Sequence, residues 1–167
     1  MRDEVREPEL DPDTLAAALR LADEIYCLHE AGSPYADQLA RLAGLTGEAL
    51  SGVDACAAFG SVDPDTWVCD LLLMRHPCPT DLSDAELIEL LAAICACDGE
   101  EWQMSWWLRC VAASTGCKEV SGLVFHPQEM LGPADGREEL TPEEILVEAR
   151  RYRRRVLVTP PPSDDAA

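Results

Sequence analysis

Basic residues are scarce in this chain. Its 167 residues hold 13 Lys and Arg against 32 Asp and Glu, which gives a formal net charge of −19 and an isoelectric point near 4.3. A nucleic-acid-binding protein needs a basic surface that displaces counterions from phosphates, so this charge balance excludes that class. The same charge favours solubility and attracts basic partners. We therefore expect no nucleic-acid partner, and a basic protein is the better candidate.

Long apolar runs are missing as well. No uncharged stretch approaches the roughly 18 residues that a membrane-spanning helix needs. The opening stretch, MRDEVREPELDP, is charged and lacks the apolar segment of a secretory signal. We therefore expect a cytoplasmic protein with no membrane partner. Its hydrophobic fraction of 47% is sufficient for a buried core at this length.

Motifs of known catalytic chemistry are also absent. The chain contains no Gly-rich phosphate loop, no Gly-x-Ser-x-Gly and no His-Glu-x-x-His. Of its three histidines, His29 ends a predicted helix, and His76 and His126 precede prolines. Paired acids fall in first helical turns, where they complement the helix dipole. No nucleophile–base set emerges, so we expect no enzyme, no catalytic residue and no cofactor.

The chain has no Cys-x-x-Cys pair, although it contains eight cysteines. In a reducing compartment they should remain thiols, and buried free thiols that pack as small hydrophobes are the preferred interpretation. A zinc site made of Cys110, Cys117 and His126 is the alternative, and we expect no bound metal. The cysteines are Cys27, Cys56, Cys69, Cys78, Cys95, Cys97, Cys110 and Cys117.

Apolar residues at helical spacing predict an all-α protein with two helical regions. Residues 1–11 are acidic and contain a proline, so we expect them to be disordered. For residues 12–76 we expect a small helical domain that belongs to no recognised family. Asp13 is expected to cap its first helix, and Asp63-Pro64 is expected to begin its last. Its helices are expected at about 14–30, 35–43, 53–59 and 63–74. Prolines at 77 and 79 mark the domain boundary.

The second region, residues 81–157, opens with a capping box, Ser83 with Glu86, and closes with another, Thr141 with Glu144. Between them lies a short apolar run that ends in His126-Pro127 and is too short for an ordinary helix. A loop is expected at 128–139 and a disordered tail at 158–167. The long helices of this region are expected at about 83–97, 100–115 and 142–155.

Three stretches of this region occur in an order typical of one protein family. They are DLSDAELIELLAAICACD, SGLVFHP and ELTPEEILVEARRYR. Through them, residues 81–155 resemble the immunity proteins of nuclease bacteriocins of the colicin and pyocin type. The resemblance implies a four-helix bundle whose third helix is a single short turn. It also implies an inhibitor that binds and blocks a secreted nuclease toxin without chemistry of its own.

In that family the short third helix presents two aromatic residues and an acid to the toxin. By position, Phe125 and His126 stand at the aromatic sites, Pro127 matches a proline, and Gly122 stands where the family has Asp. The missing carboxylate removes a charge-assisted contact with a basic nuclease. Phe125 keeps the properties of an interface anchor, and the alternative is that it fills the bundle core.

The helix predicted at 100–115 has three faces. One face, with Trp107, Cys110 and Val111, is assigned to the core. A second face varies in the family and sets toxin specificity, although Met104 and Leu108 would equally extend the core. A third carries Trp102 and Trp106, which the N-terminal half should cover, because such a patch is not left in water. The predicted partner-binding set is Glu101, Met104, Ser105, Leu108, Ala112, Glu119, Gly122, Phe125, His126 and Pro127.

The expected partner is therefore a basic nuclease bacteriocin or polymorphic toxin domain, bound by a protein that is monomeric when free. Residues 81–149 carry 15 acids against Arg109, Lys118 and Arg137, a net charge of −12 that would steer such a partner. Two other functions are considered. One is a helical adaptor or regulatory protein-interaction module that has lost toxin binding, and the other is a small metal-binding regulator.

Overall fold

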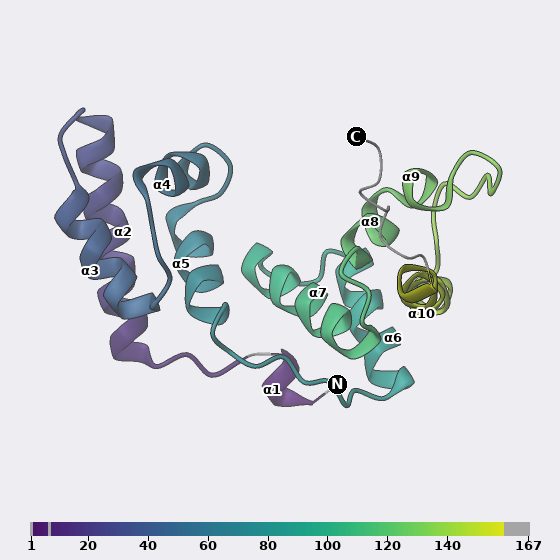
Figure 1. Cartoon of the computed structure of the whole chain (residues 1–167). Helices are drawn as coiled ribbons and strands as arrows, with labels where there is room; N and C mark the ends of the chain where they lie inside the picture. Colours follow the sequence, from purple (N-terminus) through teal and green to yellow (C-terminus); the bar gives the residue numbers. More distant parts are fainter. Residues whose placement is uncertain (1, 7, 159–167) are drawn as a thin grey trace, which may run out of the picture. The chain divides into compact units, whose positions relative to one another are not determined.

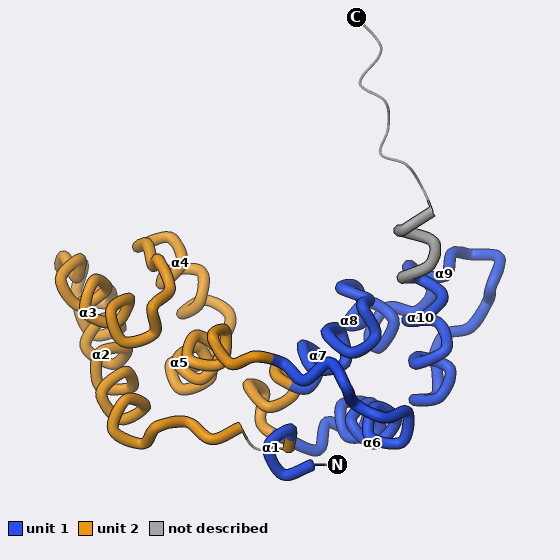
Figure 2. Tube along the Cα trace, turned by 60° about the horizontal axis from the view of Figure 1, so that its bottom comes forward, with its two compact units in different colours: residues 1–5, 78–99, 107–167 blue, residues 6–77, 100–106 orange. Residues whose placement is uncertain are grey.

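The computed structural model describes residues 2–6 and 8–158, with side chains described as far as Tyr152. The described residues form ten helices and no strands, so the predicted all-α class is confirmed (Figure 1). The chain divides into two compact units (Figure 2). Unit 1 comprises residues 1–5, 78–99 and 107–167, and unit 2 comprises residues 6–77 and 100–106.

Unit 2 is built around α2 (Pro12–Glu30), which packs against α3 (Ala36–Thr46) and α5 (Pro64–Leu73). Ile25, Leu42 and Val68 are fully buried between these helices, at helical spacing from their apolar neighbours. The N-cap of α2 is Asp11, whose carboxylate accepts a bond from the Thr14 amide at 2.8 Å. The expectation that Asp13 is the cap is wrong, because Pro12 already occupies the first helical turn.

Two further helices of unit 2 begin with side-chain N-caps. Asp63 caps α5 as predicted, accepting a bond from the Thr66 amide at 2.9 Å. The α4 helix (Gly52–Phe59) opens with a capping box between Ser51 and Asp54, which the sequence analysis did not identify. Such caps satisfy amides that have no partner inside the helix.

Unit 1 contains α6 (Asp84–Cys95), most of α7 (Glu101–Thr115), α8 (Val120–Phe125), α9 (Pro127–Leu131) and α10 (Pro142–Val158). Fully buried apolar side chains of α6 face α10, which contributes Ile145 and Ala149. Both predicted capping boxes are present. The short third helix of the expected bundle corresponds to α8, whereas α9 forms where a loop was expected at 128–139.

The face of α7 assigned to the core is buried, since Trp107 is 3% exposed and Cys110 and Val111 are fully covered. The face of α7 that carries Trp102 and Trp106 is also partly buried. Trp106 is 3% exposed, and its ring centroid lies 6.4 Å from that of His76 in the same unit. Trp102, one turn earlier, is half-buried. Trp106 thus contacts a residue of the N-terminal half, and coverage of the whole face by that half stays a prediction.

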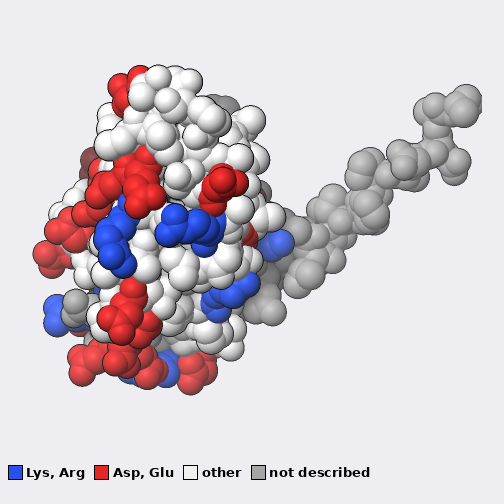
Figure 3. All heavy atoms as spheres, turned by 90° about the vertical axis from the view of Figure 1, so that its left-hand side faces the viewer, with Lys and Arg blue, Asp and Glu red and all other residues white. Residues whose placement is uncertain are grey.

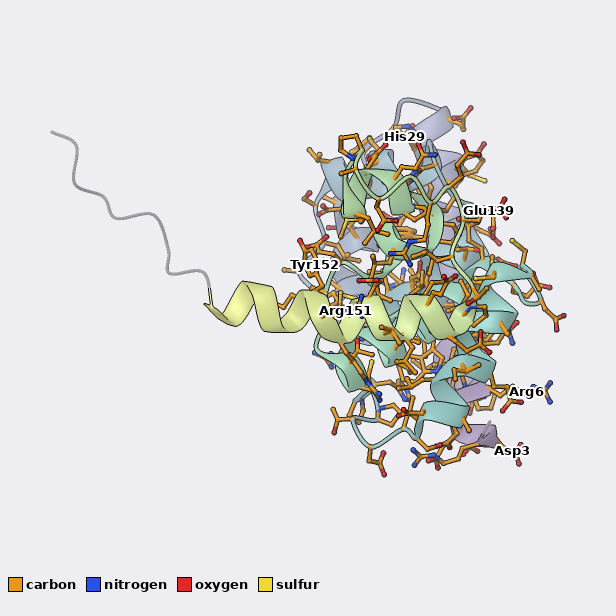
Figure 4. All side chains as sticks on the ribbon, turned by 90° about the vertical axis from the view of Figure 1, so that its right-hand side faces the viewer. Asp3, Arg6, His29, Glu139, Arg151 and Tyr152 are labelled. Atoms are coloured by element: carbon orange, nitrogen blue, oxygen red, sulfur yellow. The ribbon has the colours of Figure 1, made fainter. Side chains whose placement is uncertain are left out.

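Residues near the N-terminus depart from the sequence prediction. Disorder was expected for 1–11, but Asp3–Arg6 form α1 and Val5 is fully buried (Asp3 and Arg6 are labelled in Figure 4). Arg2 donates to Glu86 at 2.8 Å and to Asp81 at 3.1 Å, all within unit 1. Glu100 and the first six residues of α7, 101–106, belong to unit 2, which differs from the expected boundary. The predicted disordered tail lies, apart from Val158, outside the described residues.

The environment of Glu86 predicts that part of the protein's folding stability is lost in acid. Bonds from the Ser83 amide and hydroxyl, reinforced by Arg2, lower the pKa of Glu86 from 4.5 to about 2. Because the folded-state pKa is lowered, the stabilisation is present above pH 4.5 and is lost as pH falls toward about 2. We expect Glu86→Gln to be less stable than the wild type at neutral pH and to approach it near pH 2.

Urea unfolding of both proteins across this range measures the effect. The net charge of −19 also changes with pH, but this contribution is shared and cancels in the difference between the proteins. Ser83→Ala serves as a second variant, because it removes the hydroxyl that bonds to Glu86 and should reproduce part of the effect. Parallel stability curves for Glu86→Gln and the wild type would contradict this account.

Candidate interaction surface

Phe125 is the main exposed aromatic residue of unit 1. It closes α8, in which Val120 and Leu123 are 2% and 1% exposed and face the interior. Phe125 follows Leu123 by two residues, a step of about 200° around a helix, so its ring points away from that buried side. It is 50% exposed. The exposure expected of an interface residue is therefore observed, and its contact with a partner remains a prediction.

The backbone turns sharply after Phe125. His126 has φ −139° and ψ 53°, outside the helical range, and its amide donates to the Gly122 carbonyl at 2.8 Å. Pro127 then begins α9, where its missing N–H is not needed. Pro127 is buried, which does not favour its assignment to the partner-binding set, and that assignment stays a prediction. Pro127 starts α9, whose next two residues are exposed, and His126 is exposed as well.

Gly122 has a structural reason for lacking a side chain. A Cβ placed there would lie 2.8 Å from Sδ and 2.9 Å from Cγ of Met130, which reaches over from α9. A carboxylate at this position would require Met130 to move. Gly122 thus leaves room for the flexible side chain of Met130 between α8 and α9. Gly122 is half-buried and is a packing residue in this structure.

The remaining predicted residues differ in exposure and in unit. Glu119 is exposed, and Leu108 and Ala112 on α7 are half-buried; all belong to unit 1. Glu101, Met104 and Ser105 belong to unit 2, where Glu101 is exposed and the other two are half-buried. The two groups belong to different units, so a single continuous patch stays a prediction.

Several of the described arginines of unit 1 form ion pairs. Arg150 bonds to Asp84, and Glu148, only 7% exposed, accepts from Arg151 at 2.9 Å and from Arg137 at 3.1 Å (Arg151 is labelled in Figure 4). The pKa of Arg137 is raised by Asp135 and then by Glu148. These pairs neutralise part of the basic charge, so the acids in excess give the surface its sign.

The face shown in Figure 3 carries acidic side chains gathered in several groups, with basic side chains between them. One shallow groove of about 430 Å³ occurs in unit 2, with apolar walls formed by Ala17, Leu21 and Leu45. Glu24 and Arg41 approach within 3.9 Å across it, and their opposite charges compensate. Arg20 also lines the groove, so its lining carries one arginine more than it has acids.

The cysteines differ in solvent exposure, although all of them were expected to be buried. Cys69, Cys110 and Cys117 are buried, as hydrophobe-like thiols should be, but Cys27, Cys56, Cys95 and Cys97 are exposed. Burial of all eight is therefore wrong. Among the described residues no three His, Cys, Asp or Glu side chains form a group suited to a metal ion. The proposed ligand set of Cys110, Cys117 and His126 is thus not assembled in this structure.

A thiol–imidazole pair, which the sequence analysis missed, lies in unit 2. His29 Nδ1 is 3.7 Å from Cys56 Sγ, and the Tyr35 hydroxyl lies 3.4 Å from the same nitrogen and 3.5 Å from the same sulfur. These residues come from different elements and match no spacing motif. A separation of 27 residues between His29 and Cys56 gives no local signal, so only the tertiary fold reveals the pair.

Within the described part of the chain, none of the helices combines the length and the apolarity that crossing a bilayer requires. Comparisons with family models, curated proteins and solved structures found no match to this chain.

Proposed function

We propose that this protein is an immunity-type inhibitor that binds the basic nuclease domain of a bacteriocin or polymorphic toxin and blocks it without catalysis. The observation that supports it most is the exposure of Phe125. The apolar contacts of α8 with the interior are made by Val120 and Leu123, and Phe125 adds a half-exposed ring beyond them. Exposed aromatics that become buried on binding are typical hot spots.

Charge supports the same proposal. Residues 81–149 carry a net −12, and several of the arginines of unit 1 are held in ion pairs. A basic nuclease would be steered toward this surface, and the bound inhibitor would repel the DNA phosphates. Inhibition of this kind needs only bulk and negative charge beside the active cleft. Glu119 immediately precedes α8 and would contribute to the steering.

The rival function, a helical adaptor, is favoured by one specific observation. Met130 occupies the space that the family's acid would need at position 122. A protein that retained the bundle but lost the acidic contact fits an adaptor as well. The two functions differ in their consequences, because an adaptor binds its partner without suppressing DNA cleavage.

The test is a titration of the full chain against any basic nuclease domain that a neighbouring gene encodes, with DNA cleavage and binding rates measured together. We expect stoichiometric loss of cleavage. We also expect the association rate to fall by about tenfold or more between low and high salt, while dissociation changes little. Glu119→Gln should slow association in low salt and leave the dissociation rate unchanged. Binding with full cleavage retained would favour the adaptor.

A further inference from the structure

The thiol–imidazole pair of unit 2 is built from three elements. His29 lies in the last turn of α2, Tyr35 is the N-cap of α3, and Cys56 lies in α4 (His29 is labelled in Figure 4). All three side chains come within 3.4–3.7 Å of one another at their polar atoms. The thiol is exposed, whereas His29 and Tyr35 are half-buried. An exposed nucleophile therefore lies beside a less exposed base.

The imidazole is held in place by aromatic packing. Its ring centroid lies 5.9 Å from that of Tyr35 and 5.8 Å from that of Phe59. Phe59 in turn packs edge-on against Tyr26 and Trp67, each at 5.3 Å. These contacts restrict the ring of His29, so the position of Nδ1 beside the sulfur does not depend on the hydrogen bonds alone. A fixed base next to a thiol is the arrangement used to activate cysteine.

Four of the other cysteines have raised pKa values. Burial raises the pKa of Cys69 to about 11, and burial followed by the neighbouring Cys78 raises the pKa of Cys110 to about 12. Burial also raises the pKa of Cys117, and partial desolvation raises that of Cys95, although its side chain is exposed. Thiolate is the reactive form of cysteine, so these residues should react slowly. No hydrogen bond from a histidine is described for any of them.

We propose that Cys56 is a thiol–disulfide exchange site, at which a low-molecular-weight disulfide forms a mixed disulfide with the protein. The Cys56 thiol gives its proton to Nδ1 of His29, and the thiolate attacks one sulfur of the disulfide. A bond forms between Cys56 Sγ and that sulfur as the disulfide's own S–S bond breaks. The second half leaves as a thiolate and takes the proton from the imidazolium of His29, so atoms, electrons and charge balance.

Tyr35 assists this step as a hydrogen-bond donor. Its hydrogen bond with Cys56 and, next, its burial raise the pKa of the Tyr35 phenol, so the hydroxyl keeps its proton and donates it toward the thiolate sulfur. A donor at 3.5 Å stabilises the negative sulfur before it attacks. The site is in unit 2 and uses none of the residues assigned to toxin binding, so it stands independently of the proposed function.

The test uses the full, reduced chain and oxidised glutathione at neutral pH. Acid quenching at intervals, alkylation of the remaining thiols and peptide mass spectrometry give a rate for each cysteine. We expect Cys56 to form the mixed disulfide at least about tenfold faster than Cys27 and Cys97, which are exposed but lack an imidazole partner among the described contacts. Equal rates at these three cysteines would overturn the proposal without any variant being made.

His29→Gln separates base assistance from exposure. We expect the Cys56 rate to fall by about tenfold or more, while the rate at Cys27, on the same helix, is unchanged. Tyr35→Phe should also slow Cys56, by a smaller factor, because the donor to the sulfur is lost. Buried Cys69 reports on folding, since it should stay unreactive in each folded variant. A Cys56 rate that is the same in His29→Gln and the wild type would overturn the assignment of His29 as the base.

Discussion

Phe125→Ala weakens binding of the basic partner by on the order of 2–4 kcal/mol, roughly a 30- to 1,000-fold loss of affinity, and barely changes the thermal unfolding midpoint. The reason is the position of the ring, which is 50% exposed while Val120 and Leu123 fill the interior side of α8. Truncating an exposed ring removes few contacts of the folded protein. The same ring becomes covered in a complex, where the loss is larger.

The measurement combines a thermal melt of the free protein with a binding titration. Val147→Ala is the matched control, because Val147 is an exposed apolar residue of the same unit, 47% accessible, and lies outside the predicted partner-binding set. It should affect neither binding nor the melt. If Phe125 belonged to the core, the same truncation would lower the free energy of unfolding by about 3–5 kcal/mol, and the thermal midpoint would drop strongly. Such a drop would refute the interface role.

The helices and their caps were predictable because their causes are local. The Ser83–Glu86 and Thr141–Glu144 pairs lie three residues apart, so the sequence displays both partners at once. Ser51 and Asp54 show the same spacing with Asp in place of Glu and were overlooked for that reason. Asp11 and Asp13 are both possible caps, and only the backbone at Pro12 distinguishes between them.

The rest depends on contacts that are distant in sequence. Arg2 pairs with Glu86 across 84 residues and, together with buried Val5, orders a segment whose composition suggests disorder. His29 and Cys56 meet only because α2 and α4 pack in the same unit. In the predicted interface, the assignment of Phe125 came from the resemblance to a family pattern. The burial of Pro127 was not predicted, because α9 forms where its glycine and proline residues suggested a loop.

Trp106→Ala lowers the free energy of unfolding by about 3–5 kcal/mol, because a buried indole is replaced by a cavity. Trp106 is 3% exposed, and its ring meets that of His76 edge-on at an interplanar angle of 86°. Trp102→Ala is the matched control on the same face of α7 and one turn away. It is half-buried, so its loss should be roughly half as large. Urea unfolding followed by circular dichroism measures both, and equal losses would contradict the assignment of Trp106 to the core.

A second measurement locates the packing that Trp106 needs. A fragment of residues 79–167 keeps Trp106 but lacks His76 and the helices of unit 2 before it, with which residues 100–106 are grouped. Its tryptophan emission should shift to longer wavelength, and exposure of the indole should promote aggregation. The first turns of α7 would then lose their apolar cover, although the later turns keep Trp107, Cys110 and Val111 in unit 1. A monomeric fragment with unchanged emission would mean that Trp106 draws its burial from unit 1 alone.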